Sequence, residues 1–388
     1  MSLPLHLRIQ NTGVTPGLYK VLGIAEALQQ QFPLSRVLID IRHGPEVDVD
    51  AFMSFGIAGI VSRVRTECEV PQLYALSIEE AIGAGDVIRV QPSGQVNVLY
   101  RRGANANSLF VTERCNSLCL MCSQPPRQVD DSWRVGELID LLPLIDQTLD
   151  VLGVTGGEPT LLGPDLQKLL GESRRYLPAT HIHVLTNCRS FSDPAFADQF
   201  DGLRGHATWA VPLYADVARI HDEVVQAPGA FVETMNGLHN LAERGHLVEI
   251  RTVLHARTLP RILNWAHFLY RNLPFARHAA LMGLEPMGLA RGNASLLETN
   301  PSLLSAKIAP AVSLLNQAGM NVSIYNVPLC SLEPALWPFA RKSISDWKNE
   351  YASACAACAV KGDCCGFFKS ASASFRDTVA RPLRVRAA

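Results

Sequence analysis

The chain has 388 residues, of which 48% are hydrophobic and 18% are charged, and its formal net charge is −1. This length is enough for one large domain with one or two appended regions, and the composition is that of a folded globular protein. The small net charge excludes a global field that would draw the protein to nucleic acid or anionic lipid. We find no apolar run of membrane-spanning length and no secretory signal pattern, so we expect a cytoplasmic protein with no membrane partner.

Residues 1–105 are expected to form a separate α+β region. Four segments have the apolar or alternating pattern of strands: Leu5–Ile9, Arg36–Ile41, Asp86–Gln91 and Gln95–Arg101. The last two flank a Pro-Ser-Gly turn, which predicts a β-hairpin. Tyr19–Gln31 has the apolar spacing of a helix. This region has no catalytic constellation, so it is either a peptide-docking module or a lid on the domain that follows.

From Ser108 onward, predicted strands and helices alternate. The strands are short apolar runs: Ser108–Val111, Asp150–Thr155, His181–Thr186, Thr208–Leu213, Val248–Leu254 and Ala279–Leu284. The helices have apolar residues at helical spacing: Val135–Gln147, Asp165–Tyr176, Asp193–Phe200, Phe231–Arg244, Pro260–Leu273 and Pro301–Gln317. Such βα units predict a parallel sheet, and they are too few for a closed eight-stranded barrel. We predict an α/β fold, a partial (β/α)6 TIM-type barrel over residues 106–320, with a cysteine-rich extension over 321–388.

Ten cysteines need an explanation in a protein that is expected to be cytoplasmic. Disulfides are disfavoured in that compartment, so clustered cysteines indicate a metal or catalysis. We interpret the isolated Cys68 and Cys188 as small buried hydrophobes. The remaining cysteines form two groups, one in a single loop and one near the end of the sequence: Cys115, Cys119 and Cys122, and Cys330, Cys355, Cys358, Cys364 and Cys365.

The first group lies in the loop Cys115–Cys122, which follows the first barrel strand. In parallel α/β folds this end of the sheet carries the chemistry. Three cysteines at C-x3-C-x2-C spacing can ligate three irons of a cubane cluster and leave the fourth iron open to a small molecule. A structural zinc site normally takes four ligands in paired C-x2-C units. The spacing therefore favours an iron–sulfur cluster; zinc completed by a remote residue, or three unrelated core cysteines, are the alternatives.

The second barrel strand ends in Gly156-Gly157-Glu158-Pro159. Two glycines allow the backbone to approach a ligand closely, and Glu158 presents a carboxylate that can bind an ammonium group. Pro159 stiffens the exit from the strand. Alone, this motif fits an ordinary βα turn equally well, but its place one strand after the cysteine loop favours a function.

The two motifs together resemble those of the radical S-adenosylmethionine enzymes, over about residues 108–327. The resemblance implies a [4Fe–4S] cluster on the three loop cysteines, with S-adenosylmethionine chelating the open iron and Glu158 holding its ammonium group. The implied reaction passes one electron to S-adenosylmethionine and releases methionine and a 5′-deoxyadenosyl radical. That radical then abstracts a hydrogen atom from the substrate.

The resemblance also implies further cofactor contacts. Thr186 and Asn187, at the end of the third strand, match the place of ribose contacts. Arg251 on the fifth strand is a candidate for the methionine carboxylate, although a strand-end arginine is equally often solvated or ion-paired. The family commonly has an aromatic residue before the third cysteine, where this chain has Met121. A thioether also contacts π faces well, so Met121 can retain contact with the adenine.

A closer resemblance is to the His-Xaa-Ser system radical S-adenosylmethionine maturases, C-type. It rests on Cys119–Pro126, on Met282–Arg291, and on Trp347 with the run Cys364–Phe368. The resemblance implies a ribosomally made peptide substrate with His-Xaa-Ser repeats and a post-translational modification. It also implies an electron donor such as a flavodoxin or ferredoxin, and it is compatible with a partner maturase.

In the second cysteine group, Cys355-Ala-Ala-Cys358 is followed five residues later by Cys364, and Cys330 lies upstream, after a predicted strand at 321–327. Four thiolates can hold a second cluster with every iron ligated by protein, and zinc is the alternative. In maturases that resemble this chain, such an extension commonly carries an auxiliary cluster, which favours iron and sulfide. Cys364 fits the spacing better than Cys365, which is either spare or exchanges with it.

Two further residues are candidates for contact with the substrate. Glu285 ends the sixth strand as a possible acid or base, and His221 is expected on the loop after the fourth strand. Structural roles fit both equally well, and His181 and His183 read as packing residues. The leading hypothesis is a radical enzyme that modifies a peptide by an oxidative C–H functionalisation or crosslink. The alternatives are a radical enzyme acting on a small molecule and a zinc-bound scaffold that only binds a peptide.

Overall fold

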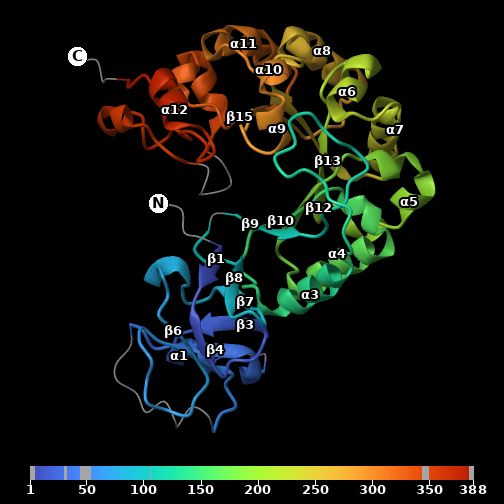
Figure 1. Cartoon of the computed structure of the whole chain (residues 1–388). Coiled ribbons are helices and arrows are strands. Elements are labelled where there is room, and N and C mark those ends of the chain that lie inside the picture. The colour runs from blue at the N-terminus through green and yellow to red at the C-terminus, as the bar shows by residue number, and fades with distance from the viewer. Residues whose placement is uncertain (1–4, 30–32, 44–53, 105, 343–348, 384–388) are drawn as a thin grey trace. The chain divides into compact units, whose positions relative to one another are not determined.

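The computed structural model describes residues 5–29, 33–43, 54–104, 106–342 and 349–383 (Figure 1). Trp347 and the last two residues of the predicted helix Tyr19–Gln31 lie outside these ranges. The chain folds into two compact units. The first comprises Met1–Leu109, Trp133–Leu152 and Glu172–Thr180, and the second comprises Phe110–Ser132, Gly153–Gly171 and His181–Ala388.

The first unit is built on a sheet with the strand order β1-β8-β7-β3-β4-β5-β6-β2. Its strands are β1 His6–Arg8, β2 Gln10–Thr12, β3 Gly17–Leu22, β4 Val37–Asp40, β5 Gly59–Val61, β6 Gln72–Tyr74, β7 Val87–Val90 and β8 Gln95–Tyr100. β1 and β2 stand at opposite ends of this order, yet only Ile9 separates them in the chain. One extended segment therefore pairs with β8 through residues 6–8 and with β6 through residues 10–12, which closes the sheet on itself.

Two predictions for this unit have different outcomes. The hairpin is confirmed, because β7 and β8 pair antiparallel. The helix over Tyr19–Gln31 is wrong in its first part: β3 continues to Leu22, and only α1, Ile24–Ala27, is α-helical. β3 lies between β7 and β4, and a central strand buries a continuous apolar run that periodicity alone does not distinguish from a helix.

A buried ionic network lies within the first unit. Lys20 of β3 has a side chain only 3% exposed, and its Nζ lies 2.5 Å from Oδ1 of Asp146. Arg102 Nε lies 2.5 Å from the other oxygen of the same carboxylate. Burial alone would raise the pKa of Asp146, but hydrogen bonds from Arg102 and Lys20 outweigh burial and lower it. The ionised carboxylate of Asp146, which lies in residues 142–152, thus binds Lys20 of β3 and Arg102 of the segment after β8.

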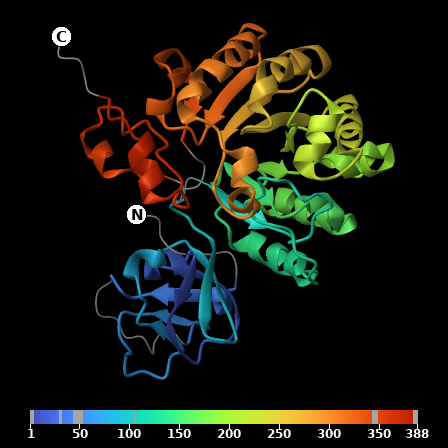
Figure 2. The ribbon, with the colours of Figure 1, turned by 45° about the horizontal axis from the view of Figure 1, so that its top comes forward.

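The second sheet has the order β16-β15-β14-β13-β12-β11-β10-β9. Its strands are β9 Asn107–Phe110, β10 Val151–Thr155, β11 His181–Leu185, β12 Ala207–Pro212, β13 Leu247–Leu254, β14 His278–Gly283, β15 Asn321–Tyr325 and β16 Ala340–Arg341. Neighbouring strands from β11 to β16 pair in parallel. Consecutive strands are neighbours, so the predicted α/β fold with an open parallel sheet of the partial-barrel type is confirmed (Figure 2).

Within the described residues, the helices along the second sheet include all six that the sequence predicted and four that it did not. They are α3 Trp133–Leu141, α4 Pro164–Tyr176, α5 Pro194–Asp198, α6 Ala218–Val225, α7 Ala230–Glu243, α8 Ile262–Asn272, α9 Leu289–Gly292, α10 Ala294–Leu297, α11 Pro301–Gln317 and α12 Ala373–Val379. α3 ends at Leu141 instead of the predicted Gln147, because Pro143 interrupts the helical pattern and a 3-10 turn follows. α6, α9, α10 and α12 were not predicted. Within the described ranges, no helix is long and apolar enough to cross a membrane.

We expect Asp146→Ala to destabilise the folded chain by about 3–5 kcal/mol, because it leaves the buried ammonium of Lys20 without this carboxylate. The free energy of unfolding in urea measures the effect. The double variant Lys20→Met/Asp146→Leu should recover most of the loss, since apolar side chains need no counterion. Arg204→Ala, which removes an exposed ion pair with Asp201, serves as the control and should leave the midpoint unchanged. Equal midpoints for Asp146→Ala and the parent would contradict a stabilising role of the network.

Candidate functional site

The cysteine loop is held in place by α6. The backbone N–H groups of Leu118 and Leu120 donate to the carbonyl oxygens of Val225 and Val224, at 3.0 and 2.9 Å. These contacts lie on either side of Cys119, the middle cysteine. The unpredicted helix α6 therefore fixes the centre of the loop.

The other end of the loop is held by α9 and the residues beside it. The N–H of Leu289 donates to the carbonyl of Cys122 at 2.8 Å, and Asn293 Nδ2 donates to the carbonyl of Leu120 at 2.9 Å. Gly288 has φ +58°, and a Cβ there would lie 2.5 Å from the Cys122 carbonyl oxygen. Only glycine fits this approach, so the stretch Met282–Arg291 supports the third cysteine directly.

The three loop cysteines are free thiols and are partly exposed. Burial raises the pKa of Cys115 to about 11 and that of Cys119 to about 12, and it also raises the pKa of Cys122. The thiols are therefore protonated at neutral pH, and a metal that binds them must displace these protons. Among the described residues, no three His, Cys, Asp or Glu side chains are gathered so closely that they could hold a single metal ion.

The Gly-Gly-Glu-Pro turn packs tightly against the residues that lead into the cysteine loop. The N–H of Gly157 donates to the carbonyl of Thr112 at 2.7 Å, and the N–H of Glu158 donates to that of Arg114 at 2.8 Å. A Cβ on Gly156 would lie 2.5 Å from the Thr112 carbonyl oxygen, and one on Gly157 would lie 2.1 Å from that of Arg114. The sequence predicted that the two glycines let the backbone approach a ligand closely. In the structure they lie close to the backbone of Thr112 and Arg114.

The carboxylate of Glu158 joins the ends of β10 and β11. The residue is 1% exposed, and Oε1 accepts hydrogen bonds from Thr160 N at 2.9 Å, Thr160 Oγ1 at 2.6 Å and Thr186 Oγ1 at 2.6 Å. Oε2 accepts from the backbone N–H of Asn187 at 2.6 Å. Burial raises the pKa of Glu158 despite these bonds. Contact of Glu158 with an ammonium group stays a prediction, since its oxygens already have protein donors here.

The residues at the end of β11 reach the first half of the cysteine loop. Asn187 Nδ2 donates to Asn116 Oδ1 at 2.6 Å, and Arg189 Nη1 donates to the Asn116 carbonyl at 2.6 Å. Arg189 also lies 2.5 Å from Glu233 of α7. Thr186 and Asn187 thus lie beside the loop. Arg189 was not singled out, although its position two residues after Asn187 is a signal that sequence reasoning could have used.

Arg251 belongs to an ionic group on the sheet. Its Nε lies 3.3 Å from Glu249 Oε1, and its Nη2 lies 3.1 Å from Met282 Sδ. Glu249 Oε2 lies 2.7 Å from His278 Nδ1 and 3.5 Å from His183 Nε2. Although burial opposes it, hydrogen bonds from the two imidazoles lower the pKa of Glu249 well below its usual range. Arg251 is therefore ion-paired, and His183, read as a packing residue, contacts a carboxylate that the sequence did not single out.

The remaining candidates have different surroundings. His221 lies within α6, so its predicted place on a loop is wrong; it is 2% exposed, and its Nδ1 accepts from the N–H of Tyr214 at 3.3 Å. Burial lowers the pKa of His221 to about 4, so it is neutral at pH 7. Glu285 is partly exposed after β14. Met121 packs in an apolar cluster that also contains Leu120 and Tyr214, an aromatic residue two positions after β12 that the sequence reasoning missed.

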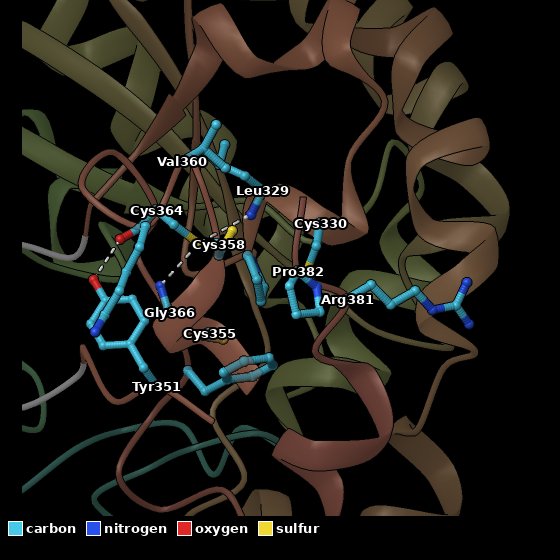
Figure 3. Close-up of a pocket in the computed structure, with 13 residues that line it drawn as sticks. Leu329, Cys330, Tyr351, Cys355, Cys358, Val360, Cys364, Gly366, Arg381 and Pro382 are labelled. Atoms are coloured by element: carbon cyan, nitrogen blue, oxygen red, sulfur yellow. Dashed lines mark hydrogen bonds between the residues drawn. The ribbon is translucent and has the colours of Figure 1, made fainter. Parts of the chain in front are cut away.

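The second cysteine group surrounds a small pocket (Figure 3). Cys330, Cys355, Cys358 and Cys364 all line it. Cys365 is 4% exposed and does not line the pocket, and its Sγ lies 3.3 Å from the Gly366 carbonyl oxygen. The structure thus brings together the four cysteines that the spacing selected, while the fifth lies outside the pocket lining.

Cys364 has the environment of a thiolate. Its Sγ lies 3.4 Å from the backbone nitrogens of Leu329 and Gly366, whose N–H groups point at it (Figure 3). A hydrogen bond from Cys365 and these two N–H groups lower the pKa of Cys364 to about 6 against the effect of burial. Cys364 can therefore bind a metal ion at neutral pH without first losing a tightly held proton.

No family model matches the chain. The pyruvate formate-lyase-activating enzyme of Staphylococcus aureus is 26% identical to it over 164 residues, which are 39% of this chain. The match spans 63% of that enzyme's length, which is less than two thirds.

Solved structures with a similar fold include SuiB of Streptococcus suis bound to S-adenosylmethionine, with a TM-score of 0.47 and 12% identity over 58% of this chain and 51% of SuiB. Another is anSMEcpe with bound AdoMet and Cp18Cys peptide, with a TM-score of 0.42 and 15% identity over 56% of this chain and 62% of the other. The maturase HydG of Carboxydothermus hydrogenoformans has a TM-score of 0.40 and 14% identity over 56% of this chain and 52% of HydG.

The parallel sheet places the loop and the Gly156–Pro159 turn at the carboxyl ends of neighbouring strands. The chain is thus similar in sequence to the activating enzyme over 164 residues, and its two motifs resemble those of the radical S-adenosylmethionine superfamily.

Proposed function

We propose that the protein is a radical S-adenosylmethionine peptide maturase, which modifies a ribosomally made peptide with His-Xaa-Ser repeats. The observation that carries the radical chemistry is the packing of the Gly156–Pro159 turn against Thr112–Arg114, the residues that lead into the Cys115–Cys122 loop. The peptide substrate is supported by the resemblance of Cys119–Pro126, Met282–Arg291 and Cys364–Phe368 to the C-type maturases. A partner maturase and an electron donor such as a flavodoxin or ferredoxin complete the proposal.

The residues of the loop fit a [4Fe–4S] cluster, because three thiols are offered and no fourth protein ligand is needed. When bound, the cluster supplies the electron that cleaves S-adenosylmethionine to methionine and a 5′-deoxyadenosyl radical. The chain holds this chemistry at the carboxyl ends of β10 and β11, beside Thr186 and Asn187. Apolar side chains around Met121 and Tyr214 keep water from the inner side of the loop. Arg251 remains our candidate for the methionine carboxylate.

The cysteine pocket is proposed to hold a second, auxiliary iron–sulfur cluster on Cys330, Cys355, Cys358 and Cys364. Four thiolates satisfy all irons of a cubane, so this centre has no open corner. Its role in the proposal is to accept an electron from the substrate, which makes the overall reaction an oxidation such as a crosslink. Glu285 is the proposed substrate-facing acid or base, since it follows β14 and is partly exposed.

Co-expression with a peptide that contains His-Xaa-Ser repeats, together with the partner maturase, tests the function directly. Mass spectrometry should show a peptide of altered mass, and a crosslink appears as the loss of two hydrogens. Cys119→Ala in the same cells should give only unmodified peptide and no 5′-deoxyadenosine. An unmodified peptide with the parent enzyme, under conditions in which 5′-deoxyadenosine is formed, would refute this substrate.

We expect Gly157→Ala to damage the first site, because the new Cβ would lie 2.1 Å from the carbonyl oxygen of Arg114. Relief of such a clash typically costs about 1–3 kcal/mol and must displace residues that lead into the cysteine loop. Iron retained by the reconstituted protein should fall, and binding of S-adenosylmethionine should weaken about tenfold or more. Gly171→Ala on α4, where a Cβ meets nothing within 4 Å, is the matched control and should be neutral or slightly stabilising.

Cys358→Ala should lower the iron content of anaerobically reconstituted protein from about eight to about four per chain. The variant should still release 5′-deoxyadenosine but form no modified peptide, because the first site is intact and the electron acceptor is absent. Cys365→Ala is the matched control and should retain the parental iron content, since Cys365 does not line the pocket. Zinc in place of iron in the parent protein would disprove the auxiliary cluster.

A further inference from the structure

The cysteine pocket is formed by three segments that are separated in the sequence. Leu329 and Cys330 come from the turn after β15, a second group of lining residues lies between Tyr351 and Phe367, and the third wall is Arg381 and Pro382 (Figure 3). We call residues 379–383, which end α12 and follow it, the strap. Three of the four cysteines belong to the second segment, and the strap lies against the same pocket as these residues.

The strap contacts cysteines from both of the other segments. The backbone nitrogen of Leu383 lies 3.5 Å from Cys358 Sγ, and its N–H donates to that sulfur, while Cys330 Sγ lies 3.9 Å from the carbonyl oxygen of Val379. The carbonyl of Leu383 in turn accepts from the N–H of Ala359 at 2.9 Å. The strap therefore pairs with the residue next to Cys358 on one side and reaches Cys330 on the other.

Helix α12 fixes the direction in which the strap leaves. The helix begins with Ser372, whose Oγ accepts from the N–H of Phe375 at 3.1 Å. It ends with a hydrogen bond from the N–H of Ala380 to the carbonyl of Arg376 at 2.8 Å, where the strap begins. The N-terminal cap and this last helical bond stabilise the short helix, and the bond from Ala359 to the Leu383 carbonyl holds the strap beside Cys358.

Backbone N–H groups directed at sulfur stabilise negative charge on it, and in iron–sulfur proteins such hydrogen bonds help to set the reduction potential. In this pocket Cys364 receives two of them, from Leu329 and Gly366. Cys358 receives one from Leu383 of the strap. The strap thus supplies one of these three N–H donors, and it goes to a cysteine that the other two do not reach.

We propose that residues 379–383 are part of the auxiliary cluster site: the N–H of Leu383 holds the thiolate of Cys358 and raises the reduction potential of the cluster, and the strap closes one side of the cluster from solvent. This inference rests on the auxiliary iron–sulfur cluster of the proposed function. It assigns to the strap a task that none of the cysteines performs. The strap acts through the Cys358 thiolate and so positions and tunes the centre.

The test compares Leu383→Pro with Leu383→Ala in the full chain, reconstituted with iron and sulfide under anaerobic conditions. Proline has no N–H, so Leu383→Pro removes the donor to Cys358 and should shift the midpoint potential of the second cluster to a more negative value. Leu383→Ala keeps the N–H and should retain the parental potential. Redox titration followed by electron paramagnetic resonance measures both. Equal potentials in all three proteins, each with about eight irons, would overturn the proposal.

Iron analysis separates this outcome from failure of the proposed function. A parent protein with only about four irons has no auxiliary cluster, and the proposed function then fails before the strap is tested. If Leu383→Pro retains about four irons and still releases 5′-deoxyadenosine, the result supports the proposed role of the strap. The second cluster is then lost because the strap no longer holds the Cys358 thiolate. If Leu383→Pro loses both clusters, a second variant that ends at Ala380 provides the test. This truncated protein should release iron to a chelator faster than the parent protein does. An equal rate of iron release would refute the proposed role of the strap.

Discussion

The start of the Cys115–Cys122 loop depends on one close contact, the packing of the Gly156-Gly157 turn on the backbone of Thr112–Arg114. The distance from Gly157 N to the Thr112 carbonyl oxygen is 2.7 Å, and any side chain at either glycine would collide with that backbone. Asp131, which is 2% exposed, holds the same stretch from the other side by accepting from Glu113 N and Thr112 Oγ1. The cysteine loop has little regular structure of its own, so these contacts determine where its first cysteine begins.

The sequence predicted most strands and helices of the parallel sheet, because each is a short apolar run followed by a helical repeat and the order in the chain is the order in the sheet. It failed where apolar spacing is ambiguous, at Tyr19–Leu22, which is a central strand. It failed again at α6, where His221 was expected on a loop. Periodicity describes a segment alone, whereas strand or helix at such a segment depends on neighbours that are distant in the sequence.

The same difference between local pattern and long-range contact applies to the site residues. Motif residues at fixed spacing, such as the cysteines, are found from the sequence because their chemistry requires a pattern. The residues that support them have no pattern: Arg189 holds the Asn116 carbonyl from β11, and Glu249 holds Arg251 within the sheet. Their partners lie dozens of residues away, and only the fold reveals them. Glu158 is different, because its motif predicted contact with a ligand. In the structure its carboxylate accepts four hydrogen bonds from the chain itself.

The two cysteine sites differ in how they relate to folding. The first takes three cysteines from one loop of eight residues, which the sheet and helices α6 and α9 position. The second takes cysteines from positions 330 to 364, in a region whose described residues form 3-10 turns, the two-residue strand β16 and the seven-residue helix α12. Small irregular regions generally need a cross-link or a metal to remain folded. In the proposed function, binding free energy at the second site is therefore also folding free energy of the extension.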